Sequence, residues 1–275
     1  NKGLEITFNT SNIQTEDFSW SSSFNIGFNE NEITRLGNDD NDIIDGQNIA
    51  RVGHPVSSFY LVEYAGVNPA NGDALFVRNT LLPDGTRDRS ITNNFGEATR
   101  VMAGNPYPEL TTGLTNTFTY KNFDASFTFQ GQQGASIYSS GGRFQSASAD
   151  FFDNQSKDQL QRWQQIGDIT SVPQVRLFGG NGTQTSTRYL QKADFVRLRN
   201  LSVGYTLPAD VTQKFFVNKL RIYFTGVNLL TFTNYEGWDP EATADFNSNN
   251  SLRAGIDFYS APPSKTYTLG INIDF

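Results

Sequence analysis

The end of the chain has the clearest pattern of hydrophobic and polar positions. From Thr266 to Phe275, apolar residues occupy every odd position and polar residues or glycine every even one. Strict alternation predicts a β-strand with two chemically different faces, because successive side chains of a strand point to opposite sides. Such a strand suits a transmembrane β-barrel, with one face toward lipid and the other toward a wet interior. The alternative is the last strand of an ordinary soluble β-sandwich.

Six further segments are predicted to be strands: 2–9, 18–28, 111–121, 123–131, 194–207 and 219–229. The same alternation recurs in all but the last, because the stretch 220–230 is apolar on both sides and its facing is ambiguous. Short and long connections alternate between these strands. The short ones lie near 10–17, 121–122 and 208–218, and the long ones near 30–110, 132–193 and 230–265. Outer-membrane barrels have short periplasmic turns and long extracellular loops. We therefore expect the C-terminus on the periplasmic side.

Some segments leave alternatives open. The stretch 195–199 does not match the facing of Leu201 onward, since it directs Arg197 and Arg199 to the apolar side. A β-bulge that shifts the register, or a strand end above the lipid, would resolve this conflict. A weaker pair of strands at 57–65 and 74–78 belongs either to the barrel or to a long loop. We also expect a short helix at about 155–165 as part of a loop.

Composition narrows the class of protein. The net charge of −7 argues against nucleic-acid binding, and the absence of cysteine excludes disulfides and thiolate metal sites. Purely apolar runs are far shorter than the about 20 residues of a transmembrane helix. This excludes a helical membrane protein but not a barrel, whose strands alternate. The chain opens at Asn1 directly on strand-like sequence, which indicates a fragment or a processed chain.

Several stretches resemble the C-terminal region of SusC/RagA-type transporters, and they follow one another in family order over nearly the whole chain. They read NKGLEITFNT, FSWSSSFNIGFN, GHPVSSFYLVEYAGVNPANGD, GNPYPELTTGLTNTFTYKNFDASFTFQGQQG, WQQIGDITSVP, RYLQKADFVRLRNLSVGYTLP, LRIYFTGVNLLTFTNYEGWDPE and PPSKTYTLGINIDF. The segments at 188–208 and 220–241 are the most specific. One stretch departs from the family. Where many members carry an acidic segment of calcium-loop type, this chain keeps only Asp84 and Asp88, too few carboxylates for a good site. We predict no metal there.

The resemblance implies an all-β fold: a large antiparallel transmembrane barrel of about 22 strands with an N-terminal plug, in the outer membrane of a Gram-negative bacterium. Residues 1–275 would form its C-terminal portion, without the plug and the N-terminal strands. The resemblance also implies a SusD-like surface lipoprotein as partner. A TonB complex, acting through the missing N-terminal part, would drive uptake of oligosaccharides or peptides. The remaining barrel and plug polypeptide must complete the structure, because an open sheet edge is not viable in lipid.

The candidate functional residues fall into two sets. The polar positions of the alternating strands are predicted to face the lumen, where they line the solute path or contact the plug: Asp124, Ser126, Thr128, Gln130, Asn272 and Asp274. Aromatic residues in the long loops are candidates for substrate contact, since aromatic planes stack on sugar rings. They are Tyr138, Phe144, Trp163, Phe178, Tyr235 and Trp238. The alternative for these aromatics, which we favour, is packing of the loops or a place in the membrane-interface girdle.

No constellation for catalysis or for a cofactor is recognisable. His54 is the sole histidine and stands beside Pro55, so we expect a structural role in a loop. The acidic stretch 39–45 is expected to be a solvated extracellular loop, with weak calcium binding as the alternative. FGGNG at 178–182 lacks the lysine of a phosphate loop. The leading hypothesis is active uptake without chemistry on the substrate. A passive porin or adhesin barrel is the second, and a soluble all-β binding module or hydrolase the third.

The last strand also predicts an assembly signal made of Tyr267, Leu269, Ile271, Ile273 and Phe275. Deletion of Phe275, or a charge at Ile271 or Ile273, should block assembly, because this strand resembles the signal read by the barrel-assembly machinery and must close the barrel by pairing with the first strand. The measurement is the amount of the full-length variant at the cell surface. Normal surface levels would contradict the assignment.

Overall fold

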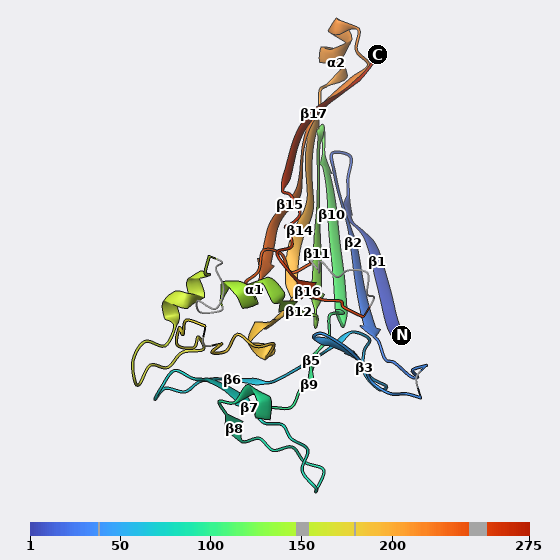
Figure 1. The fold of residues 1–275 in the computed structure, drawn as a ribbon. Coiled ribbons are helices and arrows are strands. Elements are labelled where there is room, and N and C mark those ends of the chain that lie inside the picture. Colours follow the sequence, from blue (N-terminus) through green and yellow to red (C-terminus); the bar gives the residue numbers. More distant parts are fainter. Residues whose placement is uncertain (38, 147–153, 179, 242–251) are drawn as a thin grey trace.

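The computed structural model describes residues 1–37, 39–146, 154–178, 180–241 and 252–275 (Figure 1). Its largest element is an antiparallel sheet, here called the wall sheet. The strands of the wall sheet are β1 (Lys2–Gln14), β2 (Phe18–Glu30), β10 (Leu110–Tyr120), β11 (Phe123–Gln133), β14 (Phe195–Thr206), β15 (Lys219–Thr233) and β17 (Thr266–Asp274). They lie side by side in this order. All seven predicted strands are thereby confirmed. The wall sheet is open, with β1 and β17 at its two edges.

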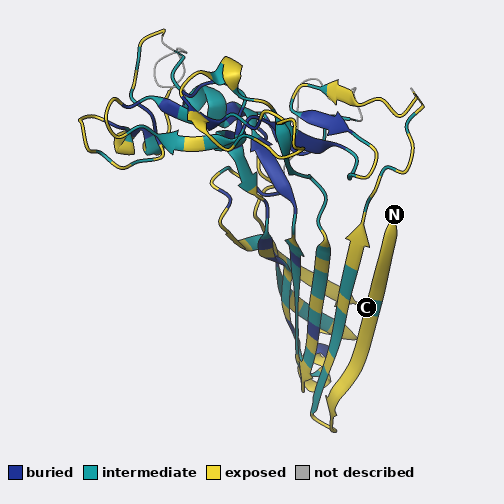
Figure 2. Ribbon diagram, turned by 90° about the horizontal axis from the view of Figure 1, so that it is seen from below, coloured by how far each residue is buried: buried dark blue, intermediate teal, exposed yellow. Residues whose placement is uncertain are grey.

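The wall sheet has one apolar and one polar face. The register places Leu114 opposite Phe24 and Phe224 opposite Leu269, whereas Ser126 lies opposite Ser202. Apolar side chains on the first face are well exposed, with 77% for Leu269. Figure 2 shows the corresponding alternation of half-buried and exposed positions along these strands. So much exposed apolar surface is unusual in water, and hydrocarbon is the solvent that suits it.

A β-bulge in β14 confirms how the facing conflict of Arg197 and Arg199 is resolved. Asn200 pairs with Thr128 of β11, and Leu198 pairs with the next residue, Phe129, so Arg199 is an extra residue. The register also shifts on the β15 side of this position. The shift keeps Leu198 on the apolar face and turns Arg197 to the polar face.

The long connections gather at one end of the wall sheet and fold into smaller sheets (Figure 1). They comprise β3 (Ile43–Asp45), β4 (Asn48–Ala50), β5 (Ser58–Leu61) and β9 (Val101–Gly104); β6 (Tyr64–Val67), β7 (Ala74–Val77) and β8 (Ile91–Thr92); and β12 (Ser136–Ser139), β13 (Leu190–Lys192) and β16 (Ile256–Asp257). The buried hydrophobic clusters lie mainly in this loop layer, around Phe59, Tyr138 and Phe76. The weak strand pair at 57–78 therefore belongs to the loops and not to the barrel.

The helical segments are short. They are η1 (Phe95–Glu97), α1 (Ser140–Gln145), η2 (Lys157–Gln161), η3 (Thr187–Tyr189), α2 (Ala209–Thr212) and η4 (Gln213–Phe215). The helix expected at 155–165 is the 3₁₀ segment η2, shorter than the prediction. The segments α2 and η4 form the β14–β15 connection, at the end of the wall sheet opposite the loop layer (Figure 1). Within the described ranges, no helix is long and apolar enough to cross a membrane.

Neighbouring residues in the middle of β14 lie on opposite faces, so we predict that their substitution by lysine changes the stability by different amounts. Leu201→Lys places a charge on the apolar face and should destabilise the full-length protein by about 2–4 kcal/mol in lipid. Ser202→Lys, on the polar face, is the matched control and should cost little. The prediction is checked by the folding yield of each variant in lipid vesicles, measured on gels from the change in electrophoretic mobility that a folded barrel shows on heating. Equal yields for the two variants would refute the assigned facing.

Candidate substrate-facing surface

The six residues predicted to face the lumen all lie on the polar face of the wall sheet. Asp124, Ser126, Thr128 and Gln130 alternate along β11, and Asn272 and Asp274 lie on β17. Small hydroxyl side chains surround them, and the Oγ1 atoms of Thr115 and Thr128 lie 2.9 Å apart. This face offers hydrogen-bonding groups to water or to a solute. Lining of a solute path and contact with a plug both stay predictions.

Two long side chains that the sequence reasoning missed also lie across the polar face. The Nε atom of Arg221 donates to Oδ1 of Asp124 over 2.9 Å, and its guanidinium carbon lies 5.0 Å from the centre of the Tyr223 ring. Gly204 lies under Arg221, and Gly270 lies under Tyr223, where a Cβ atom would collide with these side chains. The glycines thus give Arg221 and Tyr223 room to lie flat on the sheet.

The bulge in β14 carries a charge cluster formed by Arg197, Arg199, Asp239 and Glu241. Arg197 is 1% exposed, and its Nη2 and Nη1 atoms lie 2.6 Å from Asp239 Oδ2 and 2.7 Å from Glu241 Oε2. Arg199 pairs with the same Glu241 and donates from Nε to Oε1 of Gln130 over 2.6 Å. Buried charges are tolerated when they are paired in this way. Because Asp239 and Glu241 belong to the YEGWDPE segment, the cluster ties the start of the β15–β17 loop to the wall sheet.

Three of the candidate contact aromatics are buried in the loop layer. Tyr138 is fully buried and lies edge-on to Tyr189 at 6.3 Å between ring centres. Trp163 donates from Nε1 to the carbonyl of Pro69 over 3.1 Å, and Tyr235 donates its hydroxyl to Asp257 over 2.6 Å. Burial raises the pKa of Tyr138 and of Tyr235. These positions match the packing interpretation, since a buried ring offers no face to a solute.

The other three aromatics are more accessible. Phe144 is half-buried and packs edge-on against Phe258 at 5.8 Å between ring centres. Phe178 and Trp238 are 72% and 66% exposed. Trp238 directly precedes Asp239 of the charge cluster and lines a small hollow with Tyr259 and Ser260. Among the six candidates, Phe178 and Trp238 are therefore the ones whose aromatic rings are accessible to a solute.

The acidic loop residues are engaged in local contacts. Arg51 donates to Asp42 and holds the pKa of this carboxyl below its usual range, while Asp45 pairs with Arg253 over 2.6 Å. Asp84 accepts the backbone N–H of Thr86 over 2.9 Å, as in an Asx turn. Across the described ranges, no group of three acidic or histidine side chains could hold a metal ion.

His54 and the FGGNG segment also lie in loops with local contacts. The carbonyl of His54 accepts the N–H of Ile33 over 2.9 Å. In the FGGNG segment, the amide of Asn181 donates to the carbonyls of Gly72 and Gln174 and accepts the N–H of Ala74. Both arrangements hold loops together, and neither brings a catalytic partner to these residues.

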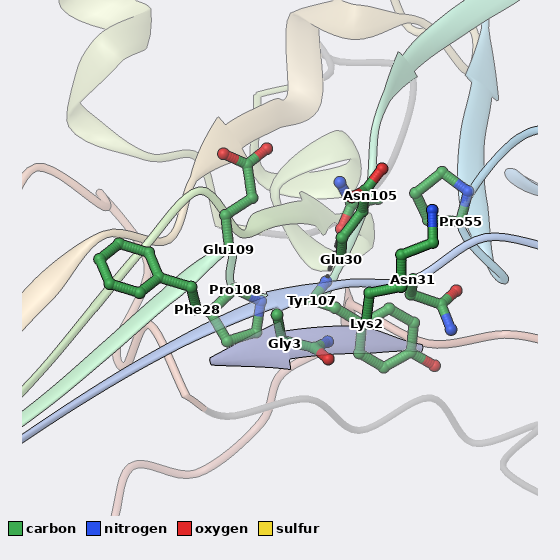
Figure 3. Close-up of a pocket in the computed structure, with 11 residues that line it drawn as sticks. Lys2, Gly3, Phe28, Glu30, Asn31, Pro55, Asn105, Tyr107, Pro108 and Glu109 are labelled. Carbon is green, nitrogen blue, oxygen red and sulfur yellow. Dashed lines mark hydrogen bonds between the residues drawn. The ribbon is translucent and has the colours of Figure 1, made fainter. Parts of the chain in front are cut away.

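A hollow of about 510 Å³ lies where the wall sheet meets the loop layer (Figure 3). Lys2 and Gly3 of β1, the end of β2, Pro55 and the segment 105–109 line it. The N–H of Val56 donates to Asn31 over 2.7 Å, and the N–H of Asn29 donates to the carbonyl of Glu109 over 3.0 Å, which fixes the connecting segments around the hollow. The hollow is bounded on one side by β1, the edge strand of the wall sheet.

Comparison with known proteins shows which proteins this chain is similar to. No family model matches the sequence. The whole chain is 34% identical to TonB-dependent receptor P3 of Formosa agariphila and 28% identical to TonB-dependent receptor SusC of Bacteroides thetaiotaomicron, of which it covers 28% and 26%. The structure of the RagAB peptide transporter matches 99% of the chain with a TM-score of 0.82 at 26% identity, over 29% of that protein's chain. The whole chain matches a part of TonB-dependent outer-membrane transporters of the SusC/RagA type.

This likeness confirms the expected fold class and outer-membrane localisation. The chain spans 28% of the length of TonB-dependent receptor P3, so the wall sheet is a sector of the barrel that SusC/RagA-type transporters form. In such a barrel the apolar face meets lipid, and the polar face remains the predicted lumen side.

The charge cluster predicts a large stability difference between two arginine variants of the full-length transporter. Arg197→Met leaves Asp239 buried without its partner and should cost about 3–5 kcal/mol. Arg51→Met removes an exposed ion pair with Asp42 and should cost about 0–1 kcal/mol. Urea unfolding of both variants in detergent measures the difference. Similar midpoints would show that the cluster contributes little to stability.

Proposed function

We propose that the chain forms part of the barrel subunit of a SusCD-like complex that imports a nutrient, an oligosaccharide or a peptide, across the outer membrane in a TonB-dependent manner. The observation that carries the proposal is the likeness of the whole chain to TonB-dependent receptors, SusC among them. The SusC/RagA-type relatives are named as receptors and transporters, and we propose no chemistry on the substrate.

The geometry of the chain supports a role in solute passage. The polar face holds small hydroxyl side chains and the Arg221–Asp124 pair, which suit contact with water and polar solutes. The loop layer has its own hydrophobic core and is tied to the wall sheet by the charge cluster. The loops thus have fixed positions at one mouth of the barrel, where the exposed ring of Trp238 can contact an entering substrate.

The partners follow from the same proposal. A SusD-like surface lipoprotein would cover the barrel mouth, and the TonB complex would act through polypeptide outside residues 1–275. Two solved structures of similar fold are of the RagAB peptide importer, one in an open-open state and one in a closed-closed state. The plug and the remaining strands would complete the barrel around the polar face.

The second candidate function is a passive porin-like or adhesin barrel. Such a barrel has no plug and no TonB-contacting segment. The wall sheet alone fits either function, because a polar inner face serves diffusion as well as active import. The likeness to TonB-dependent receptors is the observation that favours import.

Purification from outer membranes and an uptake assay test the proposal together. We expect an intact mass several times 30.6 kDa and a co-purifying surface lipoprotein. Uptake of a labelled glycan or peptide pool by cells should stop when the TonB gene is deleted or the proton gradient is collapsed. Uptake that persists without TonB would support the passive porin. A mass near 30.6 kDa with no separate plug polypeptide would refute active import.

A further inference from the structure

The connection between β14 and β15 forms a compact tip at the periplasmic end of the wall sheet. Its helical segments α2 and η4 lie beside the C-terminus of the chain (Figure 1). The N–H of Leu207 donates to the carbonyl of Leu220, and the N–H of Asn218 donates to the carbonyl of Asp274, each over 2.8 Å. The base of the tip is therefore fixed to both β15 and β17.

The tip exposes large apolar side chains. Phe215 and Phe216 are 73% and 92% exposed, and Val211 is 37% exposed. Phe216 also has a left-handed backbone conformation, with φ 59° and ψ 29°, at the residue that ends η4. Glycine or asparagine is the usual residue at such a position, because a side chain with a bulky Cβ substituent is disfavoured there. Packing within the described residues does not explain two exposed phenylalanines in this place.

The lipid face of the wall sheet leads directly to the tip. At the periplasmic end, this face carries aromatic rings in contact across neighbouring strands, with ring centres 6.4 Å apart for Phe18 and Tyr120 and 4.5 Å apart for Phe123 and Tyr205. The apolar row continues at the base of the tip, where Leu220 pairs with Ile273. Aromatic rows of this kind mark the boundary between hydrocarbon and water in membrane barrels.

Cationic side chains accompany the two phenylalanines. Lys214 lies within η4, directly before Phe215, and Lys219 begins β15; both are exposed. A lysine can extend its ammonium group to lipid phosphates while its methylene groups remain beside apolar neighbours. The combination of aromatic rings, cations and continuity with the lipid face matches a phospholipid surface in chemistry.

We propose that the tip is a membrane anchor whose Phe215 and Phe216 insert into the periplasmic leaflet of the outer membrane. The bilayer then covers the apolar side chains that the protein leaves exposed. Phe216 is 92% exposed, so the lipid can reach its side chain. This anchor would hold the end of β17 at a fixed depth. The inference depends on the outer-membrane location and not on the proposed import.

Site-directed spin labelling of the full-length transporter in nanodiscs of phosphatidylethanolamine and phosphatidylglycerol tests the anchor. Residues 1–275 contain no cysteine, so a label at Phe216→Cys is unique in this part of the protein; any cysteine elsewhere is first replaced. Asp210→Cys, an exposed polar position in the same connection, is the matched control, and Ile273→Cys reports the lipid face. Collision rates with oxygen and with a neutral nickel chelate are measured for each label.

The anchor predicts a ratio of oxygen to nickel collisions at position 216 that is several times the ratio at 210 and similar to that at 273. A ratio equal to that at 210 would place the tip in water and overturn the proposal. Low collision rates with both reagents would overturn it as well, because they would show that protein covers the tip. If the cysteine variant does not fold, quenching of Phe216→Trp by brominated lipids in excess of the quenching of the unmutated protein, with Asp210→Trp as control, gives the same decision.

Discussion

The structure depends on one constraint: in hydrocarbon, every backbone N–H and C=O group must find a partner within the protein. The wall sheet meets it by pairing each long strand with its neighbours, from β1 to β17. Strand pairing then imposes a side-chain period of two, so each strand carries a lipid side and a lumen side. The same constraint applies to the open edges at β1 and β17, which also need hydrogen-bonding partners in lipid. The sector is therefore a folded wall in the context of a complete barrel.

The bulge at Arg199 shows how charged residues are accommodated in a strand whose side chains alternate between two faces. Without it, either Arg197 would face lipid or Leu201 would face the lumen. One extra residue keeps both sides consistent and places two arginines beside the acidic residues of the β15–β17 loop. The paired charges then connect the lipid-solvated wall to the loop layer, which has a buried core of its own. The two parts meet different solvents and are joined by a buried ionic contact.

The sequence predicted the wall sheet well, because alternation follows directly from the period of a strand. It also located the conflict between Arg197 and Leu201 as a break in parity, for which a bulge was one of two explanations. It did not reveal Arg221 and Tyr223, because the stretch 220–230 is apolar on both sides. Their signal lies in the glycines opposite them on neighbouring strands, and this can be read only when the register is known. Burial of Tyr138, Trp163 and Tyr235 depends on contacts between distant loop segments, which no local pattern encodes.

The loop layer changes how the candidate contact residues are understood. A loop that packs its aromatics into a core has a defined surface, and the side chains that remain outside that core are then the ones that meet other molecules. Trp238 and Phe178 remain outside it, and Trp238 adjoins the charge cluster that fixes its segment to the wall sheet. The backbone beside this ring is held at Asp239, so a ligand that contacted the ring would find its segment already ordered, which favours binding. Movement of the β15–β17 loop would have to break or carry along the paired charges of Arg197, Asp239 and Glu241. The position of Trp238 is therefore coupled to the wall through these charges.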